Sequence, residues 1–299
     1  MKTTVLTMGL AALLFAGCSS SSDPIAEDLP PVNPTEKQIP INIATQMWSR
    51  ATDAGFEAGD KTGLYVVNYQ NGQPGQLAVS GNHVNNMRFT YSTKWTPDQP
   101  IYWLDNETHA DFYCYYPYAA SVTDVAAYPF SVQTDQSSLA NYKASDFLWA
   151  KTVNVAPSAD PVQLHARHAM SNLIIKLQAG KGYTEEDMKA AQVEIVGLKN
   201  QSTINLTTGV ATATGMAAAI QPLAETGQYR ALIVPQSISA APLVKVTIGK
   251  ASYTLNQTMT FEAHMQHTCT ITANKTNGGI NIGIDGWNKD EIDHGGIVE

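Results

Sequence analysis

Short segments in which apolar and polar residues alternate recur along the whole chain and constrain its fold more than any other feature. Alternation with a period of two puts every second side chain on one face of a β-strand. Turn signals such as Asn71-Gly72, Pro74-Gly75 and Thr208-Gly209 separate these segments. The segments are residues 63–69, 110–116, 173–177, 193–196, 229–234, 243–248 and 268–272. The pattern predicts an all-β fold made of antiparallel β-sandwiches.

Helix signals are few, and a proline-containing stretch divides the body. Thr184 is a good N-cap for a helix of barely two turns over residues 185–191, and residues 137–142 give a weaker second signal. Pro157 and Pro161 flank a turn-like stretch between two apolar blocks. We therefore predict two tandem domains, residues 37–160 and 161–299, each of a size that suits one sandwich of seven or eight strands.

The first residues resemble a bacterial lipoprotein signal. Lys2 is followed by an apolar run over residues 5–16, and small residues lead directly to Cys18. This pattern predicts a signal peptide at 1–17, fatty acyl groups such as palmitate on Cys18, and a membrane anchor rather than a membrane span. Residues 18–36, with four serines and four prolines, predict an extended tether. The alternative is an ordinary secretory signal with a coincidental cysteine.

Charge and histidine spacing exclude several partners. The net charge is −8, and no run of Lys or Arg follows the signal region, so nucleic acid is a poor partner. The pairs His165/His168 and His264/His267 have metal-like spacing, but residues three apart on a strand point to opposite faces. We predict no metal and no cofactor.

No catalytic signature is present, and the prediction is that the chain is not an enzyme. The sequence lacks a nucleophile elbow, a zinc-protease motif and a phosphate-binding glycine loop. A glycosidase stays a minor alternative, because its two carboxylates need no local motif.

The remaining cysteines and the tryptophans favour packing roles. Cys114 shares a strand face with Phe112 and Tyr116, and we predict that Cys114 and Cys269 are buried thiols, a disulfide between them being the alternative. Trp103 and Trp149 alternate with apolar residues and are predicted to fill cores. A glycan-binding face formed by exposed aromatic residues is the main alternative function. The five tryptophans that could contribute are Trp48, Trp95, Trp103, Trp149 and Trp287.

Several blocks, in order and spacing, resemble the fimbrillin family, the subunits of Bacteroidetes type V pili and their lipoprotein relatives. The blocks are residues 50–53, 56–67, 101–103, 111–118 (DFYCYYPY), 145–150, 164–173, 269–275 and 284–287. The resemblance implies two transthyretin-like β-sandwich domains and an outer-membrane lipoprotein displayed in a surface fimbrium. It also implies other pilus subunits as partners, the outer membrane through the lipid, and a host or bacterial surface ligand.

The resemblance also implies processing by an arginine-specific protease, followed by polymerisation through strand exchange. Arg50, followed by Ala51, fits the cleavage position. The alternative is that Arg50 is an ordinary loop arginine and the chain is never cut. The sequence departs from the family at Cys114 and in a short charged tail after Trp287, which argues against a long C-terminal donor extension.

Two isoleucine ridges give a physical reason for strand exchange. Each ridge places three isoleucines at period two, so both present the same apolar edge to a groove. A strand removed by cleavage would expose this groove to a neighbour's strand. The alternative is that both are resident strands of their own domains. The ridges are formed by Ile39, Ile41 and Ile43, and by Ile280, Ile282 and Ile284.

Overall fold

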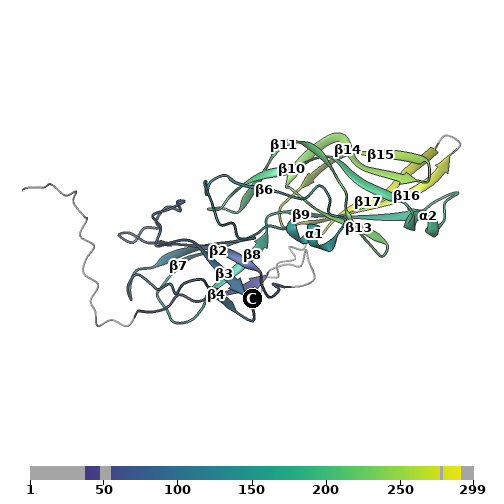
Figure 1. Cartoon of the computed structure of the whole chain (residues 1–299). Helices are drawn as coiled ribbons and strands as arrows, with labels where there is room; N and C mark the ends of the chain where they lie inside the picture. Colours follow the sequence, from purple (N-terminus) through teal and green to yellow (C-terminus); the bar gives the residue numbers. More distant parts are fainter. Residues whose placement is uncertain (1–37, 48–54, 277–278, 291–299) are drawn as a thin grey trace, which may run out of the picture. The chain divides into compact units, whose positions relative to one another are not determined.

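A computed structural model describes residues 38–47, 55–276 and 279–290 of the chain. Within these ranges the regular structure is almost all β-strand, with two short helices, and loops connect the strands (Figure 1). No helix in the described ranges is long and apolar enough to cross a membrane. The predicted all-β fold class is confirmed.

The first sheet has seven strands with β5 (Ala110–Tyr116) at its centre. Strand β1 (Ile43–Met47) lies at one edge and runs parallel to β8 (Val162–His168), whereas all other neighbours are antiparallel. The order is β1, β8, β7 (Leu148–Val155), β5, β2 (Lys61–Asn68), β3 (Val84–Tyr91) and β4 (Trp95–Pro97).

The central strand of this sheet is covered on both faces. Phe112 and Cys114 pack into a smaller core cluster, and Tyr113 and Tyr115 pack into a larger one. Because successive strand residues point to opposite faces, one apolar strand can serve two cores.

The second and third sheets pack against each other (Figure 1). Their facing side chains, including Ile175, Ile195, Val244 and Ile271, belong to the larger core cluster. The second sheet consists of β11 (Val210–Ile220), β10 (Gln192–Asn205), β14 (Gln236–Ile248) and β15 (Ala251–Phe261), with β6 (Tyr128–Ser131) beside β10. The third consists of β12 (Leu223–Glu225), β13 (Gln228–Ile233), β9 (Ser171–Ala179), β16 (Gln266–Thr276) and β17 (Gly279–Asp290).

Both helices begin at a capping residue, and the cap of the second is the predicted Thr184. In α2 (Glu185–Lys189), the Thr184 side chain accepts a hydrogen bond from the Asp187 amide, and Asp187 accepts one from the Thr184 amide. This capping box satisfies two amides that a helix start leaves unpaired. At the start of α1 (Leu139–Ala144), the Ser138 side chain accepts a hydrogen bond from the Asn141 backbone amide.

The domain boundary expected at residues 160/161 falls in the connection between β7 and β8. These two strands are paired neighbours in the first sheet, with Leu148 opposite His168. The chain leaves that sheet only after His168, and β9 begins in the third sheet at Ser171. Pro157 and Pro161 therefore lie in the connection between two strands of one sheet. Proline lacks a backbone N–H, so it interrupts strand hydrogen bonding in such a connection as it does in a linker between domains.

Both described cysteines are buried, free thiols, as predicted. Burial raises the pKa of Cys114 to about 11 and the pKa of Cys269 to about 12. Because the thiolate is the reactive form, we expect iodoacetamide at pH 8 to leave both unmodified in the folded protein and to label both after unfolding. Mass spectrometry of the two cysteine peptides measures this. Labelling of Cys114 in the folded chain at the rate of a free thiol would contradict it.

Candidate functional site

The N-terminal segment with the first isoleucine ridge is held at the edge of the first sheet by two successive partners. The Ile41 amide donates to the Ile101 carbonyl (2.9 Å), and the Trp103 amide donates to the Ile39 carbonyl (3.0 Å). The chain then moves to a new neighbour, because the Val162 amide donates to the Asn42 carbonyl (2.9 Å) and β1 continues beside β8.

The alternation predicted for this segment is present. Ile41 and Ile43 are buried, with 2% and 6% exposed surface, whereas Pro40 and Asn42 are exposed. The two isoleucines belong to the smaller core cluster with Leu64, Phe112 and Leu164, and Ile39 packs against it half-buried. The segment therefore closes a core that residues 61–168 otherwise build, while its exchange for another strand stays a prediction.

The predicted processing and lipidation positions lie outside the described residues. Arg50 and Ala51 fall between the end of β1 at Met47 and Phe56, and Cys18 precedes the described ranges. Beyond the gap, the Phe56 ring packs edge-on against Trp95 at a centroid distance of 4.8 Å. The indole N–H of Trp95 donates to the Thr45 hydroxyl (2.7 Å). One tryptophan thus contacts the chain on both sides of the predicted cleavage point.

The second isoleucine ridge lies on β17, the edge strand of the third sheet. Its backbone pairs antiparallel with β16, with Ile280 opposite Lys275, Ile282 opposite Ala273 and Ile284 opposite Ile271. The side chains of these isoleucines lie outside the described part of the structure. The backbone of β17 is therefore paired as a strand of the third sheet.

One histidine of each pair lies beside a carboxylate. His168 Nδ1 lies 2.8 Å from Asp146 Oδ1, both side chains being buried, and His267 Nε2 lies 3.4 Å from Glu262 Oε2. Across the described ranges, no group of three or more His, Cys, Asp or Glu side chains could hold a metal ion.

Three tryptophan side chains are described, and none of these three forms an exposed face. Trp95 and Trp103 are buried. Trp149 is half-buried, and its indole N–H donates to the Leu206 carbonyl (2.8 Å). The packing role predicted for Trp103 and Trp149 is confirmed. The side chains of Trp48 and Trp287 lie outside the described part.

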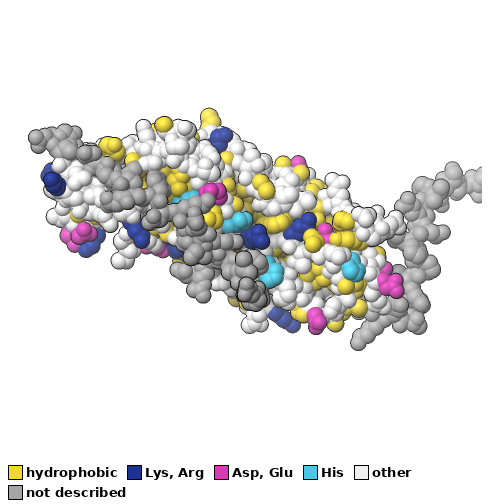
Figure 2. Space-filling view, turned by 180° about the vertical axis from the view of Figure 1, so that it is seen from behind, with side chains coloured by type: hydrophobic (Ala, Val, Ile, Leu, Met, Phe, Trp, Pro, Cys, Tyr) yellow, Lys and Arg dark blue, Asp and Glu magenta, His cyan; other side chains and the backbone are white. Residues whose placement is uncertain are grey.

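On the face shown in Figure 2, Lys and Arg side chains are scattered among acidic and apolar ones and form no large basic patch. A phosphate backbone requires a concentrated set of cations. Among its described residues, this face carries no such concentrated set of cations.

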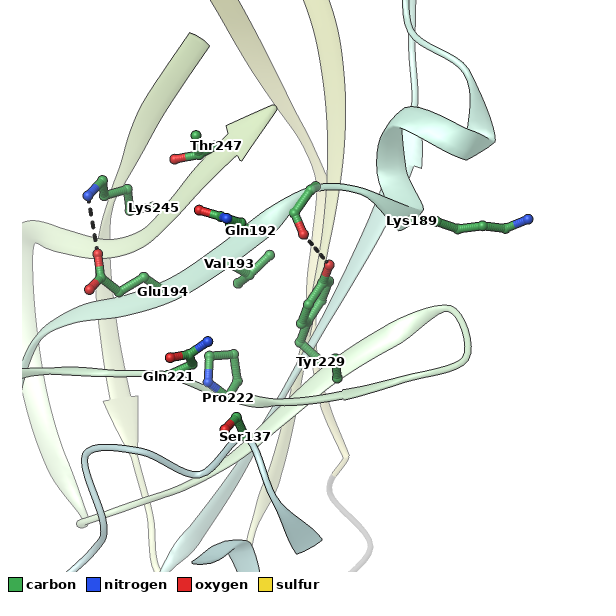
Figure 3. Close-up of a pocket in the computed structure, with 12 residues that line it drawn as sticks. Ser137, Lys189, Gln192, Val193, Glu194, Gln221, Pro222, Tyr229, Lys245 and Thr247 are labelled. Carbon is green, nitrogen blue, oxygen red and sulfur yellow. Dashed lines mark hydrogen bonds and ion pairs between the residues drawn. The ribbon is translucent and has the colours of Figure 1, made fainter. Parts of the chain in front are cut away.

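A cavity of about 510 Å³ opens between the start of β10, the start of β12, β13 and β14 (Figure 3). Its ionic groups are already paired: Lys245 Nζ lies 3.2 Å from Glu194 Oε2, and the Lys189 ammonium bonds Glu186 at 2.7 Å. The Tyr229 hydroxyl donates to the Ala191 carbonyl (2.9 Å). The walls of this pocket are polar, and the Ser137 hydroxyl on one of them donates a hydrogen bond to Asp135 Oδ1.

A second cavity, of about 360 Å³, lies at one end of the first sheet, where Tyr69, His109 and Asn154 meet. Sequence reasoning missed it, because its lining comes from three segments far apart in the chain. The signal available in the sequence was the Asn71-Gly72 turn beside an aromatic residue.

Known proteins show where the chain belongs. The fimbrillin-like family model matches residues 49–287. A provisionally named fimbrium subunit, Fim1C of Bacteroides uniformis, is 25% identical over 96% of this chain and 95% of its own length. A provisionally named fimbrium tip subunit of Bacteroides ovatus is 26% identical over 56% of this chain but only 34% of its own length.

Solved structures agree on the fold. A provisionally named cell adhesion protein of Bacteroides uniformis has a TM-score of 0.64 at 22% identity, covering 86% of this chain and 99% of that one. A similarly named protein of Bacteroides ovatus has a TM-score of 0.68 at 18% identity, covering 85% and 98%. With a family match over most of its length and this shared fold, the chain belongs to the fimbrillin-like family.

Proposed function

We propose that this chain is a surface-anchored pilus subunit or adhesin that assembles by strand exchange after its N-terminal strand is removed by proteolysis. The observation that carries the proposal is the edge position of β1, together with the burial of Ile41 and Ile43 in the core of the first sheet. Membership of a family of fimbrial subunits supports the same role. We propose no catalytic step for it.

Loss of this segment would leave two kinds of unsatisfied surface. The carbonyl of Ile101 and the amides of Trp103 and Val162 would lose their hydrogen-bond partners. The sites of the three isoleucines would open to water, and their refilling by a partner's strand would contribute roughly 5–9 kcal/mol, before ordering costs, at about 1.5–3 kcal/mol each. Exposed strand edges of this kind recruit strands from other chains.

The donor that we propose is the ridge on β17. Its three isoleucines repeat at the same period as those of the N-terminal segment. Because β17 pairs with β16 along its length, donation requires that it leave this neighbour. The direct test is whether an arginine-specific protease converts purified monomer into filaments.

Anchoring through Cys18 gives a separate prediction. Replacing Cys18 by Ala removes the thiol that accepts the lipid, so we expect the protein to leave the membrane fraction. Cys114→Ala is the matched control and should stay with the membrane, because that thiol is buried in the fold. Fractionation and labelling with a fatty-acid analogue measure both. Unchanged labelling of the Cys18→Ala protein would rule out this anchor.

A further inference from the structure

Three neighbouring strands at the centre of the first sheet bring their connections to the same end of it. Strand β5 is antiparallel to both β2 and β7, so the end of β2, the start of β5 and the end of β7 lie together. The cavity of about 360 Å³ opens there, and we call it the Tyr69 pocket. Its size is at the lower end of the range for small-molecule sites. It is lined by Tyr69, Asn71, Gly72, Glu107, Thr108, His109 and Asn154.

Local hydrogen bonds fix the first two walls of the Tyr69 pocket. Gln70 and Gln73 exchange both backbone hydrogen bonds, at 2.9 and 3.0 Å, across a turn in which Asn71 and Gly72 have φ of 51° and 73°. Positive φ at both central positions is typical of a tight type I′ hairpin. The Tyr69 amide donates to the His109 carbonyl (2.8 Å), which ties this hairpin to the start of β5.

A carboxylate cap fixes the loop before β5. Asp105 Oδ1 accepts from the Glu107 amide (2.9 Å), and Asp105 Oδ2 accepts from the Thr108 hydroxyl (2.7 Å). Such side-chain hydrogen bonds to neighbouring backbone hold a loop in one conformation. Glu107 and Thr108 therefore reach the pocket from a fixed loop.

The third wall is built by a β-bulge. Ala110 pairs with Val155 and Phe112 pairs with Thr152, so Val153 and Asn154 together oppose the single residue Asp111. Asn154 has a φ of 55°, which Asn tolerates better than most residues. A bulge of this kind redirects a side chain, and the Asn154 Oδ1 atom lies 2.8 Å from His109 Nδ1.

The bulge is held by a buried carboxylate. Asp111 is only 3% exposed on an otherwise apolar strand, and its Oδ1 accepts from the Asn154 amide (2.9 Å). Burial of a carboxylate is costly unless it is hydrogen-bonded. Burial, followed by the nearby Asp111 carboxylate, raises the pKa of the Tyr69 and Tyr113 hydroxyls. Asp111 thus holds the bulge that places Asn154 in the pocket wall.

The lining chemistry selects a class of ligand. The half-buried ring of Tyr69 offers an apolar face beside the His109 ring, at a centroid distance of 6.3 Å. The side-chain amides of Asn71 and Asn154 offer hydrogen-bond donors and acceptors, and Glu107 offers a carboxylate. The described lining residues include no Lys or Arg. A pyranose needs one apolar surface for its C–H face and planar polar groups for its hydroxyls. An acidic sugar would meet the Glu107 carboxylate without a cation among the described lining residues.

We propose that the Tyr69 pocket binds a pyranose sugar that carries no acid group. If the chain is a pilus subunit, as proposed above, this pocket supplies it with a glycan-adhesion site. The described residues that line this pocket include no tryptophan, so it differs from the face of exposed aromatic residues considered in the sequence analysis.

The test is saturation-transfer NMR on the purified full chain with methyl glycosides of glucose, galactose, mannose and N-acetylglucosamine, and with N-acetylneuraminic acid as the acidic probe. We expect transfer to at least one neutral glycoside and none to the acidic sugar. Tyr69→Ala should weaken binding at least about tenfold, because it removes the stacking surface. Asn154→Gly tolerates the positive φ but removes the amide, and should also weaken binding.

Tyr102→Ala is the matched control. Tyr102 is 38% exposed and does not line the pocket, so its removal should leave binding unchanged. Thermal unfolding of each variant confirms that the fold persists. The proposal is overturned if no neutral glycoside shows transfer, if the acidic sugar binds equally well, or if folded Tyr69→Ala protein binds like wild type. Filament formation by Tyr69→Ala should be unchanged, so loss of sugar binding and failure to assemble are separate results.

Discussion

Replacing Ile41 by Asp is expected to lower the free energy of unfolding by more than about 4 kcal/mol. Ile41 is 2% exposed in the smaller core cluster, so the variant loses an apolar side chain and places a carboxylate among Leu64, Phe112 and Leu164. Denaturant unfolding of the full chain measures the change.

The same variant should show a pH dependence of known sign. Burial raises the pKa of the new carboxyl above its unfolded value, so the native state holds a proton that the unfolded state releases. Stability relative to wild type should therefore fall as the pH rises from about 4 to about 8. Asn42→Asp is the control, because Asn42 is exposed on the neighbouring position and the same charge there should change stability little. Equal destabilisation by both variants would show that Ile41 does not close the core.

The sequence predicts those elements whose local signals are consistent. The alternation over residues 110–116 matches the bounds of β5, and the Thr184 cap matches the start of α2. Here the strand period or the helix cap alone determines the element, and tertiary contacts agree with it.

Long strands with bulges are harder to predict. Alternation predicts only residues 193–196 of β10, which runs from Gln192 to Asn205. Gly197 has a φ of 77°, and the register against β11 shifts between Ile195 and Leu198. A Cβ at Gly197 would lie 2.2 Å from the Pro242 carbonyl oxygen, so a close backbone approach requires glycine there. The bulge moves the side chains to the other face and ends the visible pattern.

The isoleucine ridge and the Tyr69 pocket also differ in how far the sequence predicts them. The ridge of Ile39, Ile41 and Ile43 lies within five residues and is visible as a period of two. The Tyr69 pocket depends on Asp111 holding a bulge on a neighbouring strand, and this pairing has no local signal. Sequence periodicity therefore identifies a strand that packs, but not a cavity that three strands build together.

Cleavage after Arg50 is expected to convert the chain from monomer to oligomer. The cut places β1 and all three isoleucines of the ridge on the released side, where non-covalent contacts with β8, residues 101–103, Trp95 and the core hold them. A covalent strand is bound at a high effective concentration, and a cut one competes with strands of neighbouring subunits. Size-exclusion chromatography after digestion with an arginine-specific protease should show oligomers, and N-terminal sequencing should find Ala51 first.

Three variants separate cleavage from charge. Arg50→Ala and Arg50→Lys both remove the arginine-specific site, but Lys keeps the cation, so both should stay monomeric and folded. Arg88→Lys is the matched control, because Arg88 pairs with Asp98 on the surface and its replacement should leave cleavage and assembly intact. If the Arg50→Lys protein forms oligomers as readily as wild type, release of the N-terminal strand does not control assembly. The family assignment would survive that result, because it rests on residues 49–287 as a whole and not on one arginine.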